Sequence, residues 1–191
     1  MRFRTPLIAA PVLVAVYGAI RLVPGSREPG PGWLTGHTAL LAALLLFVPV
    51  LGWLGRGAAG RVAAGIGLVG LACSVAQTAI DLYVGAAAAD KADQNRMFEQ
   101  IQAHPGVLPV VYTVGPLLFY VGLLAVAVVA AVHRRVPYWT PLLLLAGTVA
   151  MAASLDLLPL GGALYLLAFR PAAGATAGGP ATASGTPVRV A

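Results

Sequence analysis

The chain has 191 residues, of which 59% are hydrophobic and only 9% are charged. Soluble domains carry about 25% charged residues, so this composition excludes an ordinary water-soluble domain. The net charge of +6 does not indicate nucleic-acid binding, because the 12 Lys and Arg residues are scattered between apolar segments instead of forming one patch. A single cysteine excludes an intrachain disulfide and a multi-cysteine metal site. These features predict an integral protein of the lipid bilayer.

Six apolar segments follow one another along the chain, bounded by charged residues, Gly, Pro or Asn. A membrane-spanning helix needs about 20 apolar residues, and the first four segments approach or exceed this length. The last two segments come from one apolar stretch that is interrupted by a polar turn at Asp156 and by Pro159. We therefore predict an all-α, polytopic transmembrane helical bundle whose six spans lie at about residues 5–23, 37–54, 62–84, 107–132, 138–154 and 157–169.

The sixth segment is the shortest. Its 13 residues would cover only about 20 Å as a helix. Five spans followed by a re-entrant tail are therefore the alternative to six spans. Between the third and fourth spans, residues 86–106 predict a helical connection on the outer side, with one apolar edge. Residues 171–191 are rich in Ala, Gly and Thr and predict a disordered cytoplasmic tail.

The distribution of Lys and Arg predicts the orientation, because these residues accumulate in cytoplasmic loops. With six spans, one side receives eight of them, namely Arg2, Arg4, Arg56, Arg61, Arg134, Arg135, Arg170 and Arg189. The other side receives four, namely Arg21, Arg27, Lys91 and Arg96. With five spans the tail changes sides and the asymmetry disappears. The count therefore favours six spans, with both termini in the cytoplasm and the bundle in the plasma membrane.

Polar residues recur along one face of the third segment. Gly70 is followed at helical offsets of 4, 7, 8 and 11 by Ser74, Gln77, Thr78 and Asp81. Polar atoms do not face lipid, so this polar stripe is expected to face other helices or an internal aqueous space. It is either a packing surface or a ligand-binding or proton pathway that opens outward. A carboxylate that is partly removed from water needs a partner, and we predict Arg21 or His37 as the partner of Asp81.

Two histidines and two aspartates are expected near the outer ends of the spans, namely His37, Asp81, His104 and Asp156. Such residues can bind zinc, but here each comes from a different segment and no HxxxH or HxxE pair is present. We interpret Asp156 instead as a cap of the last helix. The chain also lacks the sequence motifs of phosphate-binding loops, zinc-protease helices and nucleophile elbows. We therefore predict no metal, no cofactor and no catalytic residue.

Three short motifs add a resemblance. Gly36-His37-Thr38-Ala39-Leu40-Leu41 opens one span, Gly115-Pro116-Leu117-Leu118-Phe119 lies within another, and the last contains Leu157-Leu158-Pro159-Leu160-Gly161-Gly162-Ala163-Leu164. In this order they resemble the small, uncharacterised six-span integral membrane proteins of actinobacteria. The resemblance covers about residues 5–170. It implies a helical bundle in a bacterial plasma membrane, and it assigns no catalytic or binding residue.

Two hypotheses of function follow. The first is a non-enzymatic component, namely a small transport or ligand-binding protein or a partner of other membrane subunits, with the polar stripe as its interior and an unspecified small molecule as its ligand. The alternative is an intramembrane enzyme or redox subunit that uses the outer His and Asp groups. The sequence favours the first hypothesis, because no catalytic motif is present.

Overall fold

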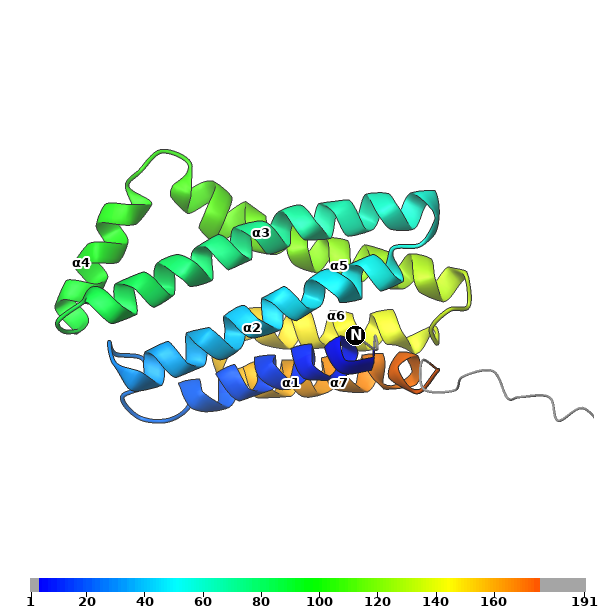
Figure 1. Cartoon of the computed structure of the whole chain (residues 1–191), viewed down its shortest axis with the longest axis horizontal. Coiled ribbons are helices and arrows are strands. Elements are labelled where there is room, and N and C mark those ends of the chain that lie inside the picture. Colours follow the sequence, from blue (N-terminus) through cyan, green and yellow to red (C-terminus); the bar gives the residue numbers. More distant parts are fainter. Residues whose placement is uncertain (1–3, 176–191) are drawn as a thin grey trace, which may run out of the picture.

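The computed structural model describes residues 4–175, and every regular element in that part of the chain is helical (Figure 1). The predicted all-α class is therefore confirmed. In chain order the elements are α1 (Arg4–Arg21), α2 (Pro31–Leu54), α3 (Gly57–Ala87), α4 (Lys91–Gln102), the π-helix η1 (Val107–Val114), α5 (Gly115–Val132), α6 (Trp139–Ala153), the 3₁₀-helix η2 (Leu155–Leu157) and α7 (Leu158–Ala175).

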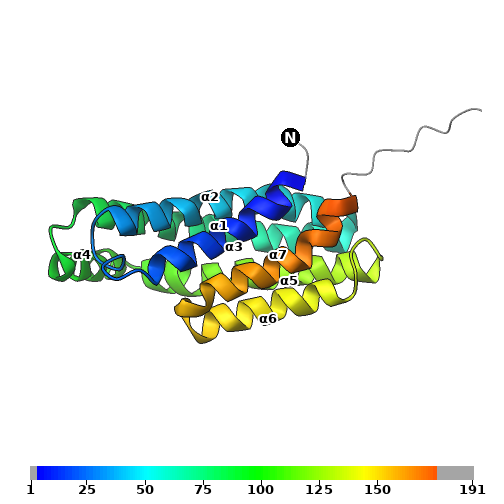
Figure 2. The same ribbon diagram turned by 90° about the horizontal axis from the view of Figure 1, so that it is seen from below.

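The long helices α1, α2, α3, α5, α6 and α7 lie side by side, and each runs antiparallel to its neighbours in the sequence (Figures 1 and 2). One end of the bundle carries α4, together with the loop at 22–30 and η2, and we call it the α4 end. At the opposite end α1 begins and α7 ends, and the loops at 55–56 and 133–138 lie there too. We call this the terminal end.

Five helical segments of the described residues are long and apolar enough to cross a membrane, namely Arg4–Arg21, Pro31–Leu54, Gly57–Ala87, Val107–Val132 and Leu155–Gly174. The remaining long helix, α6, has 15 residues and a length of about 22 Å. It packs against α5 and α7 and runs in the direction that the antiparallel order requires.

The short helix is not the one that the sequence predicted. The predicted sixth span ended at residue 169, followed by a disordered tail from 171, whereas α7 continues through Pro171 to Ala175. Ala172 and Ala173 are only 2% and 3% exposed, and this packing offsets the backbone hydrogen bond that Pro171 does not donate. The predicted tail is therefore wrong for residues 171–175. Residues 176–191 lie outside the described part of the chain.

The other predicted bounds differ in both directions. Two helices are longer than predicted, because α2 begins at Pro31 instead of 37 and α3 covers Gly57–Ala87 instead of 62–84. Two are shorter, because α1 covers Arg4–Arg21 instead of 5–23 and α6 covers Trp139–Ala153 instead of 138–154. The predicted bounds 107–132 agree with those of η1 and α5 together. The predicted helical connection at 86–106 contains α4, whose first turn is capped by the Asp90 carboxylate, which accepts a hydrogen bond from the Asp93 N–H at 2.8 Å.

The core is centred on Phe47 of α2. Its ring centroid lies 5.2 Å from that of Phe119, 6.3 Å from that of Tyr165 and 6.5 Å from that of Phe169. Helices α3 and α5 approach so closely that a Cβ atom at Gly70 would lie 2.0 Å from the backbone nitrogen of Phe119. Glycine is required there because no side chain fits between the two backbones.

Candidate functional site

Four ionisable side chains from four helical segments meet at the α4 end. Tyr17 comes from α1, His37 from α2, Asp81 from α3 and Tyr112 from η1. The Tyr17 hydroxyl oxygen lies 3.4 Å from His37 Nε2, and His37 Nε2 lies 3.8 Å from Asp81 Oδ2. The Tyr112 O–H donates a hydrogen bond of 3.4 Å to Asp81 Oδ1. We call these four residues the buried cluster, since His37 is 5% exposed and Asp81 is 9% exposed.

The backbone assigns the proton on the His37 ring. Nδ1 lies 2.9 Å from the Trp33 carbonyl oxygen, which only accepts hydrogen bonds, so Nδ1 carries a hydrogen. In the neutral ring Nε2 is then an acceptor, and the Tyr17 hydroxyl is its donor. In the charged ring Nε2 also carries a hydrogen and faces the Asp81 carboxylate. His37 Nε2 therefore has a partner whether the ring is neutral, when it accepts from Tyr17, or charged, when it faces Asp81.

Trp33 holds the His–Asp pair in place from one side. Its ring stacks on His37 with centroids 4.1 Å apart and an interplanar angle of 26°. Its indole N–H donates a 2.7 Å hydrogen bond to the Asp81 backbone carbonyl. Gly85, one turn further along α3, makes room for the ring, because a Cβ atom there would lie 2.1 Å from Trp33 Cδ1. Trp33 thus ties α2 to α3 beside the pair.

Helix α4 covers this arrangement. The Phe98 ring lies 6.1 Å from that of Trp33, and the Lys91 ammonium lies 5.7 Å from the centre of the same indole. Lys91 also donates to the Gln94 side chain at 2.7 Å and to the Arg27 carbonyl at 3.0 Å. Through Trp33 and Lys91, these contacts hold α4 and the loop at 22–30 against the outer side of the buried cluster.

A small cavity lies between the cluster and that loop. It has a volume of about 10 Å³, and its lining includes Tyr17, Arg21, Ser26 and His37. This volume is about that of one water molecule. The Arg21 Nε atom is buried and has no hydrogen-bond partner in the described part of the chain. The site is therefore closed to ligands larger than water and retains a polar lining.

The predicted polar stripe does not form one site. The Ser74 hydroxyl donates to the Gly70 carbonyl at 3.1 Å, and the Thr78 hydroxyl donates to the Ser74 carbonyl at 2.8 Å, so both are satisfied within α3. Gln77 is half-buried. Asp81 is the one stripe residue that joins the buried cluster. The rest of this face lies along the close contact of α3 with α5, which favours the packing interpretation.

The two expected partners of Asp81 have different places. His37 lies within 3.8 Å of the carboxylate. Arg21 forms no ion pair with Asp81 in the described residues and lies instead on the lining of the small cavity. Arg21 sits at the last residue of α1, whereas His37 lies six residues inside α2, level with Asp81.

The other outer ionisable residues lie apart from the cluster. His104 is exposed, and its Nδ1 lies 2.9 Å from the Gln100 carbonyl oxygen of α4. Asp156 forms an ion pair with Arg27 at the surface. The Asp156 carboxylate accepts from Arg27 and from no backbone N–H of α7 within the described residues, so the predicted cap is not observed. Ser154 caps η2 by accepting the Asp156 N–H at 3.1 Å. Among residues 4–175, no three His, Cys, Asp or Glu side chains gather in a way that would hold a metal ion.

Sequence reasoning missed Tyr17, Trp33 and Tyr112 as members of the site or its support. The spacing of four between Trp33 and His37 places both on one helical face and was the available signal. Tyr112 gave no such signal, because its position depends on the π-helical turn that precedes Gly115.

Comparison with protein-family models, with curated proteins and with solved structures finds no match to this chain. The site is therefore interpreted from its geometry.

Proposed function

We propose that this chain is a non-enzymatic integral membrane protein of a bacterial plasma membrane, with six spans and both termini in the cytoplasm. The five long apolar helices support this placement. So do large apolar side chains that point outward from the bundle, such as Val69 at 59%, Leu117 at 63% and Leu142 at 60% exposed. Such a surface is unfavourable in water and suits lipid. Helix α6 counts as the remaining span and requires local thinning of the bilayer.

The charges of the two ends support the orientation. Among the described residues, the terminal end carries Arg4, Arg56, Arg61, Arg134, Arg135 and Arg170 and no acidic side chain. All six acidic residues of the chain lie at or near the α4 end. By the positive-inside rule, the terminal end faces the cytoplasm and the α4 end faces outward.

Within this placement, the function that the geometry supports best is reversible proton binding by the His37–Asp81 pair. The observation that carries this proposal is the pairing of the two side chains at 3.8 Å in a buried position between two tyrosine hydroxyls. The adjoining cavity of about 10 Å³ admits a water molecule and no larger ligand. A proton is therefore the ligand that fits, and it would arrive from the outer side past Arg21 and Ser26.

The surrounding groups are suited to either protonation state. When Asp81 is ionised, it accepts the hydrogen bond of Tyr112 and faces His37. When His37 is neutral, Nε2 accepts from Tyr17. Ionisable groups inside membrane bundles are costly and commonly mark proton relays or ligand pathways. We therefore assign the chain to the class of small transport or ligand-binding components, or partner subunits of such proteins, with a proton-linked site near the outer surface.

Infrared spectroscopy of the purified, reconstituted protein tests the proton site. Over about pH 4 to pH 9, where carboxyl and imidazole groups titrate, the protein should show a carboxyl band that changes with pH and is lost in Asp81→Asn. In His37→Gln the pH midpoint of the change in this band should shift, because the His37 and Asp81 side chains interact. Asp156→Asn, which removes a surface carboxylate, is the matched control and should keep the band. Identical spectra for the unchanged protein and Asp81→Asn would contradict the proposal.

A further inference from the structure

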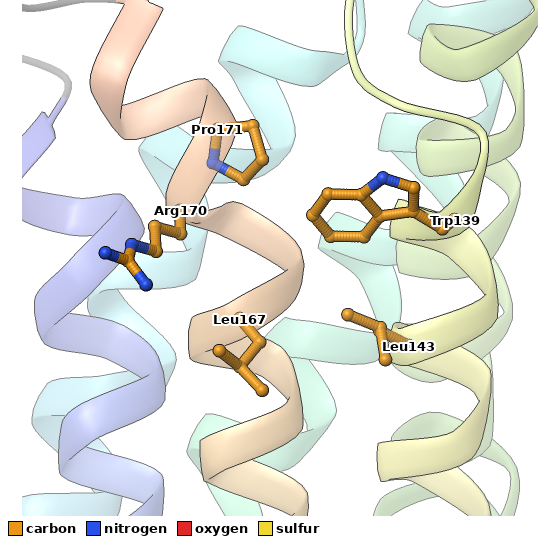
Figure 3. Close-up of a pocket in the computed structure, with 5 residues that line it drawn as sticks. All are labelled: Trp139, Leu143, Leu167, Arg170 and Pro171. Atoms are coloured by element: carbon orange, nitrogen blue, oxygen red, sulfur yellow. The ribbon is translucent and has the colours of Figure 1, made fainter.

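Two grooves flank α7 along Leu167 and Arg170, and a third, of about 630 Å³, is lined by residues of the 131–138 segment together with Pro171 and Ala172. The groove between α6 and α7 has a volume of about 730 Å³ and is lined by Trp139, Leu143, Leu167, Arg170 and Pro171 (Figure 3). The groove between α1 and α7 has a volume of about 450 Å³, and its lining includes Arg4, Ile8, Leu166, Leu167 and Arg170. Leu167 and Arg170 belong to both linings, so the two grooves are separated only by this face of α7.

Both grooves repeat one arrangement of residue types along the bundle axis. Arg4, Trp139 and Arg170 lie near the terminal end. Each has an apolar groove residue four positions away on the same helix, one turn closer to the middle of the bundle. These residues are Ile8 on α1, Leu143 on α6 and Leu166 on α7. The grooves are therefore apolar inside and cationic or amphipathic at the mouth, as the acyl region and the headgroup region of a leaflet require.

The two arginines at the mouths have no polar partner among the described residues. Arg4 and Arg170 are exposed and take part in no hydrogen bond or ion pair within residues 4–175. Figure 3 shows the Arg170 guanidinium directed toward α1, the helix that carries Arg4, and away from Trp139. The neighbouring Arg135 is different, because it donates to the Leu54 carbonyl at 2.9 Å. Two free guanidinium groups facing one groove mouth provide a site for a phosphate.

We infer that the two grooves hold one anionic diacyl phospholipid of the cytoplasmic leaflet. Its phosphate lies between Arg4 and Arg170, and its two acyl chains lie in the two grooves on either side of Leu167. The leaflet assignment rests on the proposed membrane placement, and it does not depend on the role of the buried cluster. A second copy of this chain does not fit as the occupant, because all six acidic residues lie at or near the α4 end and none would reach these arginines.

Native mass spectrometry of the full chain in detergent tests the site. The probes are phosphatidylglycerol and phosphatidylcholine with the same acyl chains, and inorganic phosphate. The unchanged protein should retain one phosphatidylglycerol at least about tenfold more strongly than phosphatidylcholine. The double variant Arg4→Gln/Arg170→Gln should lose that preference. Arg56→Gln/Arg61→Gln removes the same charge from the same end at exposed positions that line none of the grooves beside α7, and it should keep the preference.

A second variant tests the acyl grooves separately. Leu167→Trp places a bulkier side chain on the wall that the two grooves share and leaves the two arginines in place, so it should also lower phosphatidylglycerol retention. Equal loss in the Arg56→Gln/Arg61→Gln control, or equal retention of the two lipids, would overturn the site. Displacement of the lipid by inorganic phosphate alone would assign the arginines to a free anion and would equally overturn it. Labelling of the terminal end from outside the cell would refute the membrane placement and leave the lipid preference in detergent unchanged.

Discussion

The buried cluster and the mouths of the two grooves lie at opposite ends of the bundle and place their polar side chains in opposite surroundings. At the α4 end, Tyr17, His37, Asp81 and Tyr112 contact one another, and Arg27 pairs with Asp156 across two loops. At the terminal end, Arg4 and Arg170 have no such partners among the described residues. The buried groups require partners because they are removed from water, whereas exposed guanidinium groups retain water or lipid phosphate around them. The buried cluster is thus held by internal contacts, whereas the groove mouths present their arginines to the outside.

This comparison predicts that a substitution costs more beside the buried cluster than at an open position. Gly85, beside Trp33, and Gly65, in the half of α3 nearer the terminal end, provide a matched pair on one helix. Gly85→Ala places Cβ 2.1 Å from Trp33 and should destabilise the protein by about 3 kcal/mol. Gly65 has open space around it, and Gly65→Ala should stabilise the helix by up to about 1 kcal/mol. Unfolding in detergent micelles measures both, and equal effects would break the comparison.

The next largest effect is expected within the cluster. Asp81→Ala leaves the Tyr112 hydroxyl and His37 without their acidic partner and should cost about 2 kcal/mol. A double-mutant cycle with His37→Ala should give a coupling free energy of about 1 kcal/mol. Gln77→Ala, one turn away on the same helix, is the control and should change stability by less than about 0.5 kcal/mol. Additive effects of the Asp81 and His37 variants would show that the two side chains do not interact.

The ion pair of Arg27 with Asp156 is expected to contribute less. The two side chains are 49% and 51% exposed, so water screens their attraction. Asp156→Asn should cost at most about 1 kcal/mol, and the cost should shrink as salt is added. Unfolding of the unchanged protein and the variant at low and high salt measures this. If Asp156→Asn destabilised the protein more than Asp81→Ala does, the exposed ion pair would contribute more than the buried contacts, and the comparison would be contradicted.

The smallest effect is expected for the free arginines. In detergent without phospholipid, Arg170→Gln should change the free energy of unfolding by less than about 0.5 kcal/mol, because no hydrogen bond or ion pair within residues 4–175 is lost. Addition of phosphatidylglycerol should raise the melting temperature of the unchanged protein more than that of the variant, since a ligand of the folded state stabilises it. A large loss of stability in lipid-free detergent would show that Arg170 has a structural role.

The sequence predicted the helical class and the bounds of Val107–Val132, because an uninterrupted apolar run of that length is unambiguous. It misplaced the end of α7, because the packing of Ala172 and Ala173 is a tertiary effect. The helical offsets within the polar stripe correctly predicted that its residues share one face of α3. They did not show that Ser74 and Thr78 bond to their own backbone while Asp81 meets another helix.

The remaining site residues show why a single sequence is insufficient. Tyr17 and Tyr112 reach the cluster from α1 and η1, and their contacts depend on how those helices are rotated about their axes. Periodicity describes faces within one helix, but it does not specify which faces of different helices meet. Arg21 and His37 were both predicted as partners of Asp81, because all three residues were expected near the outer ends of their spans. Span bounds specify this depth, but they did not distinguish His37, which lies beside the carboxylate, from Arg21, which forms no ion pair with it within the described residues.

Impermeant thiol labelling of intact cells tests the central claim most directly. In a Cys73→Ala background, one cysteine is introduced at exposed Asn95 on α4 and, in a second variant, at Tyr138, which is 80% exposed at the terminal end. The account predicts that Asn95→Cys reacts in intact cells, whereas Tyr138→Cys reacts only after the membrane is opened. Labelling of Tyr138→Cys from outside, or of both variants equally, would contradict the proposed threading of the helices through the membrane.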